Sequence, residues 1–83
     1  MKIIFTERAR KDWRWLDRAT REQLRKKLSF YLKQNHIFQF SEKLKDSARG
    51  EYRFRIGDYR IVFDYSGGEI FVLRVGHRKN IYR

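Results

Sequence analysis

Three arginines in residues 52–60, YRFRIGDYR, have the type and the spacing of a phosphate site. Arg53 and Arg55 alternate with apolar residues, and a Gly-Asp pair with the composition of a hairpin turn separates them from Arg60. A two-residue turn places Arg55 directly opposite Arg60, where like charges destabilise a hairpin by ~0.2–1 kcal/mol. Guanidinium groups bind phosphate through paired hydrogen bonds. The cluster therefore predicts phosphate binding, and by itself it does not indicate catalysis.

The C-terminal residues 74–83, RVGHRKNIYR, form a second polar group. Gly76 is expected to end a strand at Val75, which would deliver His77 and Arg78 to the edge of the arginine face. A lone histidine near a chain end is usually an ordinary surface residue, and a tyrosine in a last strand is usually a packing residue. The position of His77 and Arg78 beside the three arginines is what predicts a functional site.

Alternating hydrophobicity predicts the strands that must position these residues. The expected strands are 52–56, 59–65, 70–75 and a short segment near 80–82. In the first two, the aromatic and aliphatic side chains fall on one face and the arginines on the other. We therefore expect the apolar face to lie under helices and the arginine face to meet solvent.

The turn between the second and third of these strands decides the face on which Arg74 lies. A three-residue turn over 66–68 places Arg74 opposite Arg60, whereas a two-residue Gly-Gly turn places it in the core. The three-residue turn also points three apolar residues inward: Phe71, Leu73 and Val75. We favour this turn because it keeps the arginine in water.

The first half of the chain predicts a strand and a helical hairpin. The expected elements are a strand over 2–5, a helix over 7–17, a second helix from Thr20 to about Asn35 and a loop over 36–50. Thr6 is the expected cap of the first helix, and Thr20 with Gln23 matches a capping box for the second. The element order predicts one small α+β domain over residues 1–83, an antiparallel sheet with an N-terminal helical hairpin packed on one face.

The charge of the chain indicates the class of partner. The 83 residues include 21 Lys and Arg against 10 Asp and Glu, a formal net charge of +11. Such an excess favours nucleic acid as the partner, then an acidic protein, then a membrane surface. The chain has no cysteine and no acidic cluster, so we expect neither metal nor cofactor. No apolar run approaches membrane-spanning length, so a cytoplasmic protein without membrane contact is expected.

The second expected helix carries a further basic surface, formed by Arg21, Arg25, Lys26 and Lys27. An ordinary solvated helix face and a phosphate-tracking surface explain this composition about equally well. Trp15 falls outside the apolar stripe of the first helix. It is expected either to cover an edge of the core or to lie in a partner interface, and the first is favoured.

The segments YRFRIGDYRIVF at 52–63 and VLRVGHRKNIY at 72–82 resemble the RelE/ParE superfamily of type II toxin–antitoxin toxins, specifically its RelE-like branch. The run REQLRKKL at 21–28 also fits, and the resemblance covers essentially the whole chain. It implies an mRNA interferase, a ribosome-dependent endoribonuclease that cuts mRNA in the ribosomal A site and inhibits translation. It also implies an acidic antitoxin encoded beside the toxin, the 70S ribosome and mRNA as partners, and operator DNA only in complex with the antitoxin.

The resemblance assigns catalytic roles to Arg53, Arg55, Arg60, Arg78 and Tyr82. RNA is cleaved without metal when its own 2′-OH attacks the adjacent phosphate, which requires a base, cations on the phosphate and an acid for the leaving oxygen. The first three arginines would bind the phosphate, and Arg78 would stabilise charge at the leaving 5′-oxygen.

The identity of the base remains open between two residues. Tyr82 has an ordinary pKa of ~10 that neighbouring guanidinium groups would lower, and His77 titrates near neutrality. The wider expected RNA- or ribosome-binding set comprises Arg74, Lys79, Arg83, Arg21, Arg25, Lys26 and Lys27.

Two other functions fit parts of the pattern. A non-catalytic ParE-like toxin would inhibit DNA gyrase on the same fold, without needing the arginines and the terminal tyrosine. A plain nucleic-acid-binding module would use the basic faces for binding and cleave nothing.

Overall fold

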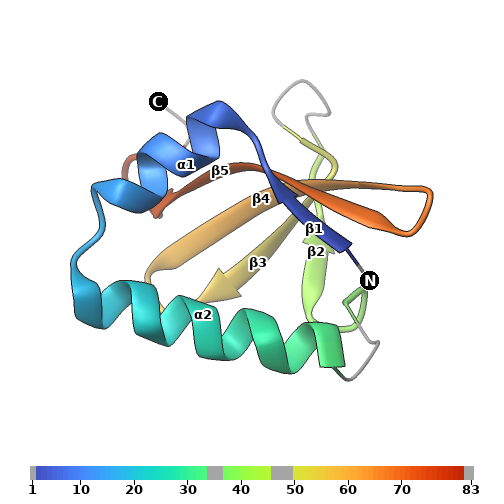
Figure 1. The fold of residues 1–83 in the computed structure, drawn as a ribbon. Helices are drawn as coiled ribbons and strands as arrows, with labels where there is room; N and C mark the ends of the chain where they lie inside the picture. The colour runs from blue at the N-terminus through green and yellow to red at the C-terminus, as the bar shows by residue number, and fades with distance from the viewer. Residues whose placement is uncertain (1, 34–36, 46–49, 82–83) are drawn as a thin grey trace.

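Two helices and five strands make up the described part of the chain, residues 2–33, 37–45 and 50–81, in the computed structural model (Figure 1). The elements are β1 (Lys2–Phe5), α1 (Glu7–Arg14), α2 (Arg18–Lys33), β2 (Ser41–Lys43), β3 (Tyr52–Ile56), β4 (Tyr59–Ser66) and β5 (Glu69–His77). The strands form one sheet in the order β1-β5-β4-β3-β2. Neighbouring strands are antiparallel except for β1 and β5, which are parallel. The helices between β1 and the rest of the sheet give the chain the length that a parallel connection requires. The predicted α+β fold is confirmed, with this parallel pair added.

Side-chain caps determine where the helices begin. The Thr6 hydroxyl accepts a hydrogen bond from the backbone N–H of Ala9 at 3.2 Å, which confirms the predicted cap of α1. The capping box predicted at Thr20 is wrong, because α2 begins at Arg18 and the Asp17 carboxylate accepts from the Thr20 N–H at 3.2 Å. Hydrogen bonds from Thr20, its side chain first, hold the pKa of Asp17 below its ordinary value.

The limits of the two helices also differ from the prediction. α1 ends at Arg14, earlier than the expected residue 17. The chain turns after Arg14, and Asp17 already caps the start of α2. The expected end of the second helix at Asn35 lies outside the described residues.

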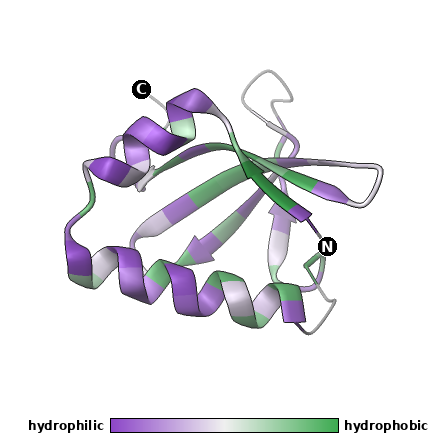
Figure 2. Cartoon of the chain, in the orientation of Figure 1, coloured by the Kyte–Doolittle hydropathy of each residue, from purple (hydrophilic) through white to green (hydrophobic). Residues whose placement is uncertain are grey.

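Helix α2 lies across one face of the sheet and buries its apolar stripe there (Figure 1). Leu24, Leu28 and Tyr31 are buried against the aromatic side chains of β3 and β4. Phe54 stacks on Phe63 with 4.5 Å between ring centroids, and each such buried ring stabilises the fold by about 1.5–3 kcal/mol. In Figure 2, hydrophobic and hydrophilic bands alternate along β3 and β4 and along both helices, as expected for elements with one buried face.

The hairpin between β4 and β5 has a two-residue turn, so the predicted three-residue turn is wrong. Ser66 pairs with Glu69, and both intervening glycines have the positive φ that this turn type requires. A register shift follows, because Val62 pairs with Arg74 and Phe63 with Val72. Leu73 is therefore an extra residue in a β-bulge.

The bulge and the two-residue turn together set the side-chain directions of β5. The bulge returns Arg74 to the arginine face, as predicted, but opposite Val62 and not opposite Arg60. The two-residue turn corrects the prediction that Phe71 points into the core, because it places Phe71 opposite Asp64. Leu73, the bulged residue, was also predicted to point inward, and both side chains are only half-buried. Ile70, Val72 and Val75 are the buried residues of β5.

Two further predictions about strands are wrong. β5 continues through Gly76 to His77, and residues 78–81 form a turn in place of the start of a last strand. The N–H groups of Asn80 and Ile81 donate to the His77 carbonyl, and Ile81 packs against Gly76. The expected loop over 36–50 contains the three-residue strand β2, which is too short to show an alternating pattern.

Candidate phosphate-binding site

The β3–β4 register brings three arginines to the face of the sheet opposite α2. Arg55 pairs with Arg60, and Arg53 pairs with Val62, so the three arginines share one face as the sequence predicted. The hairpin turn is the expected Gly57-Asp58 pair. The site is thus built on two rigid, hydrogen-bonded strands.

Arg53 and Arg55 share one carboxylate, which sequence reasoning missed. The Arg53 Nη2 donates to Oε2 of Glu42 at 3.1 Å, and the Arg55 Nη1 donates to Oε1 at 3.3 Å. Glu42 lies on β2, directly opposite Arg53. Hydrogen bonds from Arg53, and then from Arg55, hold the pKa of Glu42 below its ordinary value of 4.5. No local pattern revealed this residue, because β2 is too short.

Arg60 has a different environment from its cross-strand neighbour. It is only 6% exposed, so the expectation that the arginine face meets solvent is wrong at Arg60. Its Nη1 donates to the backbone carbonyls of Gly57 at 3.0 Å and Tyr59 at 2.8 Å. The two guanidinium groups opposite each other therefore have different hydrogen-bond partners. The carboxylate of Glu42, bound to Arg55, offsets part of the like-charge repulsion that the sequence predicts between the two arginines.

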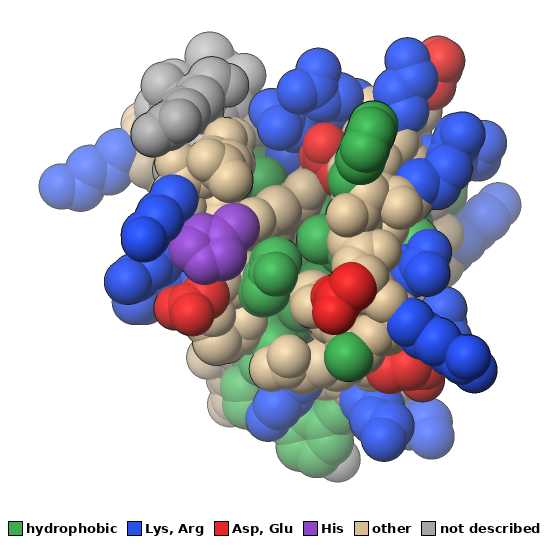
Figure 3. Space-filling view, turned by 90° about the vertical axis from the view of Figure 1, so that its left-hand side faces the viewer, with side chains coloured by type: hydrophobic (Ala, Val, Ile, Leu, Met, Phe, Trp, Pro, Cys, Tyr) green, Lys and Arg blue, Asp and Glu red, His purple; other side chains and the backbone are tan. Residues whose placement is uncertain are grey.

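The end of β5 comes together with the β3–β4 turn. The Arg78 N–H donates to the Asp58 carbonyl at 2.7 Å, and the Arg78 Nε lies 3.6 Å from the Asp58 carboxylate. His77 pairs with Tyr59 and meets its ring edge-on at 5.5 Å. Figure 3 shows this end of the molecule, where basic side chains surround the margin and the imidazole lies beside basic and acidic groups.

The hydrogen bond to the His77 ring fixes one of its nitrogens as an acceptor. The backbone N–H of Lys79 donates to Nδ1 at 3.2 Å. A neutral His77 ring therefore carries its proton on Nε2. To accept a proton from a substrate, this histidine would have to give up its bond to Lys79.

The expected binding residues outside this site are dispersed. The Arg74 Nε donates to the Asp12 carboxylate at 2.9 Å, and the same carboxylate oxygen accepts from the Val75 N–H at 2.9 Å. Arg74 thus connects α1 to β5. The remaining described members lie elsewhere, with Lys79 exposed in the final turn and Arg21, Arg25, Lys26 and Lys27 on α2. Tyr82 and Arg83 lie outside the described residues.

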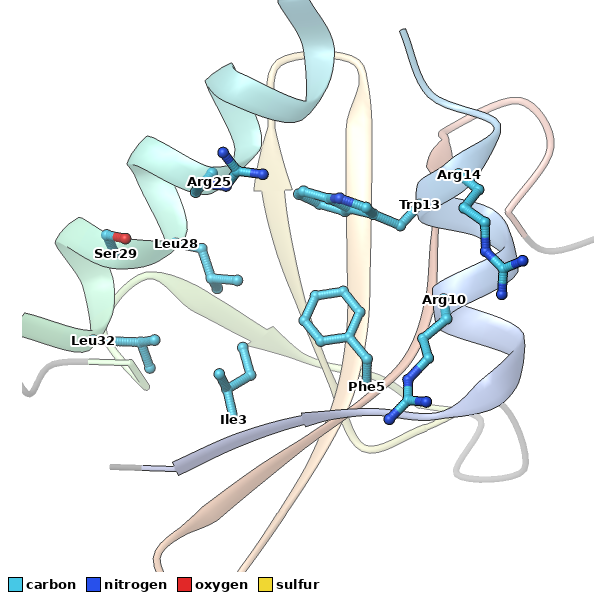
Figure 4. A pocket seen from close by; sticks show the side chains of 9 residues that line it. All are labelled: Ile3, Phe5, Arg10, Trp13, Arg14, Arg25, Leu28, Ser29 and Leu32. Atoms are coloured by element: carbon cyan, nitrogen blue, oxygen red, sulfur yellow. The ribbon is translucent and has the colours of Figure 1, made fainter. Parts of the chain in front are cut away.

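A second surface feature is a groove between α1, α2 and β1 (Figure 4). Its volume is about 580 Å³, and its apolar lining comes from Ile3, Phe5, Trp13, Leu28 and Leu32. Phe5 and Trp13 meet edge to face with centroids 5.7 Å apart. Three arginines, Arg10, Arg14 and Arg25, also line the groove. The groove therefore combines an apolar interior with arginine side chains at its margin.

Trp15 does not cover the core, which corrects the favoured prediction. Its side chain is 89% exposed, and with Lys11 and Arg14 it borders a shallow hollow at the end of α1. The alternative, a position in a partner interface, stays a prediction.

Two kinds of feature are absent from the described ranges. Residues 2–33, 37–45 and 50–81 contain no group of three or more His, Cys, Asp or Glu side chains placed to hold a metal ion. Neither α1 nor α2 has the length and apolar composition needed to span a membrane.

Comparison with known proteins gives concordant matches along the whole chain. A family model for the ParE toxin of the type II toxin-antitoxin system, parDE, matches residues 3–82. Toxin RelE3 of Methanocaldococcus jannaschii is 29% identical over 84 residues, covering 99% of this chain and 96% of the relative.

Two solved structures share the fold. The RelB-RelE antitoxin-toxin complex from Methanococcus jannaschii contains a chain that matches with a TM-score of 0.73 and 27% identity, covering 95% of this chain and 94% of that one. The isolated E. coli RelE toxin matches with a TM-score of 0.72 and 33% identity, covering 98% of this chain and 89% of that one.

Proposed function

Because the chain belongs to the RelE/ParE superfamily of type II toxin–antitoxin toxins, we propose that it is an mRNA interferase. In this proposal the toxin is an endoribonuclease that cuts mRNA on the 70S ribosome and so inhibits translation. The observation that supports it best is the arginine face, on which Arg53, Arg55 and Arg60 lie together on two paired strands. Binding to gyrase does not require such a cluster of phosphate-binding groups.

The proposed reaction is metal-free transesterification. The 2′-oxygen of the RNA bonds to phosphorus while the bond from phosphorus to the 5′-oxygen breaks, which leaves a 2′,3′-cyclic phosphate and a 5′-hydroxyl. Arg53 and Arg55 bind the non-bridging oxygens, and Arg60 adds positive charge beneath them. Arg78 stabilises the leaving 5′-oxygen by charge, because a guanidinium does not give up its proton in this pH range.

The 2′-OH must lose its proton to a base, and Tyr82 is the preferred candidate. The His77 Nδ1 already accepts a hydrogen bond from Lys79, so the histidine is the second choice. The ring of His77 is better placed to donate from Nε2 to a phosphate oxygen. In this proposal it contributes to binding of the substrate.

The wider basic surfaces serve binding to the ribosome in this proposal. Lys79 and Arg83 would extend the site along the RNA backbone, and the exposed cations of α2 would contact ribosomal RNA. Arg74 has a mainly structural part, because its guanidinium is committed to Asp12.

The proposed regulator is a cognate acidic antitoxin, with which the toxin would bind operator DNA in the cytoplasm. A relative of this chain is solved as a RelB-RelE antitoxin-toxin complex. The groove between the helices and β1 has an apolar interior and an arginine rim, which suits an amphipathic segment with acidic side chains.

One observation favours a second function. The family model that matches residues 3–82 is described as the ParE toxin, so inhibition of DNA gyrase is the alternative. The two activities damage different molecules and can be distinguished in one experiment.

The test is induction of the toxin in cells without its antitoxin, followed by mapping of mRNA 5′ ends and analysis of plasmid topology. We expect translation to stop and mRNA to be cut within codons on ribosomes. Arg55→Ala, Arg78→Ala and Tyr82→Phe are expected to reduce cleavage by about 10-fold or more each, as for loss of one charge-stabilising or proton-transfer group.

Three outcomes would contradict parts of this proposal. Undiminished toxicity of all three variants would refute the catalytic assignment. Intact mRNA together with relaxed or linear plasmid DNA would establish the gyrase alternative. Binding of RNA without any cleavage would leave a nucleic-acid-binding module.

A further inference from the structure

The pair Arg53 and Arg55 has a bound anion in the free protein, and it is a carboxylate of the same chain. Each arginine donates to a different oxygen of Glu42, at 3.1 and 3.3 Å. Two guanidinium groups on the two oxygens of one anion reproduce the contacts that a phosphodiester would make with its non-bridging oxygens. We propose that Glu42 occupies the phosphate position of this site and must leave it when RNA binds.

The strands explain why one carboxylate reaches both arginines. Arg53 and Arg55 are two residues apart on β3, so their side chains project from the same face roughly 7 Å apart along the strand. Glu42 pairs with Arg53 across the β2–β3 ladder. A side chain of glutamate length there extends between the two guanidinium groups.

The position of Glu42 also makes it displaceable. Its side chain is 46% exposed, and those of its partners Arg53 and Arg55 are 26% and 56% exposed. Ion pairs in such contact with water contribute little to stability. β2 lies at the edge of the sheet and pairs with β3 alone, so the strand that carries Glu42 is held from one side only.

Glu42 thus competes with an external phosphate for the same two arginines. With the carboxylate in place, the guanidinium groups of Arg53 and Arg55 are held side by side although their charges repel. Removal of its charge should leave two cations that bind an external phosphate more tightly. The identity of this phosphate as RNA rests on the proposed function, whereas the masking of the arginine pair does not.

The experiment compares Glu42→Gln with the wild-type protein and with a control of equal charge. The probe is a short, fully 2′-O-methylated RNA oligonucleotide, which cannot undergo attack by its 2′-oxygen, and binding is measured by fluorescence anisotropy. We expect Glu42→Gln to lower Kd by about 3- to 10-fold, in keeping with loss of two exposed ion pairs. Glu7→Gln also raises the net charge by one, and its carboxylate on α1 lies 3.9 Å from Lys11. This control should change Kd by less than about 2-fold.

The double variant Glu42→Gln with Arg55→Ala identifies the origin of the gain. If the carboxylate masks the pair, adding Glu42→Gln to Arg55→Ala should improve binding less than adding it to the wild type. That difference is the coupling between the two positions. Glu42→Asp provides a second variant with the charge retained. It is one methylene shorter and cannot reach both arginines, so a partial gain in affinity is expected.

Equal effects of Glu42→Gln and Glu7→Gln would overturn the inference, because net charge alone would then explain the binding. Failure of both the wild type and Glu42→Gln to bind the oligonucleotide would also overturn it. Cleavage on ribosomes is scored separately. Tighter oligonucleotide binding by Glu42→Gln in a toxin that cuts no mRNA would support the masked site and reject the interferase. Cleavage of mRNA without tighter binding by Glu42→Gln would support the interferase and reject the masked site.

Discussion

At the scale of single residues, Arg60 combines a structural role with its proposed catalytic one. Its buried guanidinium satisfies two carbonyl groups of the β3–β4 turn. Arg60→Ala is expected to lower the free energy of unfolding by about 2–3 kcal/mol, because charge-assisted hydrogen bonds outweigh the relief of ~0.2–1 kcal/mol of repulsion with Arg55. Urea denaturation measures this loss.

Arg55→Ala provides the control for that measurement, because its side chain is exposed and its ion pair is weak. It should change the unfolding free energy by less than about 1 kcal/mol. Equal stability of the two variants would show that the turn does not depend on Arg60. A loss of toxicity in Arg60→Ala is informative about chemistry only at a temperature where the variant is folded.

At the scale of elements, one carboxylate connects α1 to the edge of β5. β1 pairs with β5 only as far as Val72, and beyond it the Val75 N–H donates to Asp12 of α1. Asp12→Ala would remove that acceptor and the partner of Arg74 together. We expect a loss of about 2–4 kcal/mol in unfolding free energy, together with faster hydrogen exchange at the Val75 amide.

The matched change on the same helix is Glu7→Ala, whose carboxylate is exposed and lies 3.9 Å from the Lys11 ammonium. It should leave exchange at Val75 unchanged. If Asp12→Ala exchanges at the wild-type rate, α1 is held by its apolar contacts alone.

At the scale of the whole molecule, the net charge of +11 should give stability and RNA affinity opposite responses to salt. Added salt screens self-repulsion, so Tm should rise between low and physiological ionic strength. The same ions compete for phosphate, so the logarithm of the RNA association constant should fall by ~0.7 per phosphate contact for each tenfold rise in salt. Calorimetry and anisotropy over one salt series measure both. A flat binding response would exclude the arginine face as an RNA surface.

Local patterns in the sequence were sufficient for the hairpin at the centre of the site. A Gly-Asp turn between alternating segments determines the β3–β4 register, and that register alone puts Arg55 opposite Arg60. The apolar stripe of α2 and the Thr6 cap are also set by near neighbours in the chain. The resemblance of segments 52–63 and 72–82 to the RelE/ParE superfamily was sufficient to predict the family.

Only the tertiary structure decided how those arginines are paired and buried. Glu42 comes from a strand too short to show a period, and the Asp12–Arg74 contact joins residues 62 positions apart. The bulge at Leu73 changed the pairing of β5 without a local signal in the alternation. These features depend on which distant surfaces meet when the core closes, so sequence spacing predicts the arginine face but not the carboxylate bound to it.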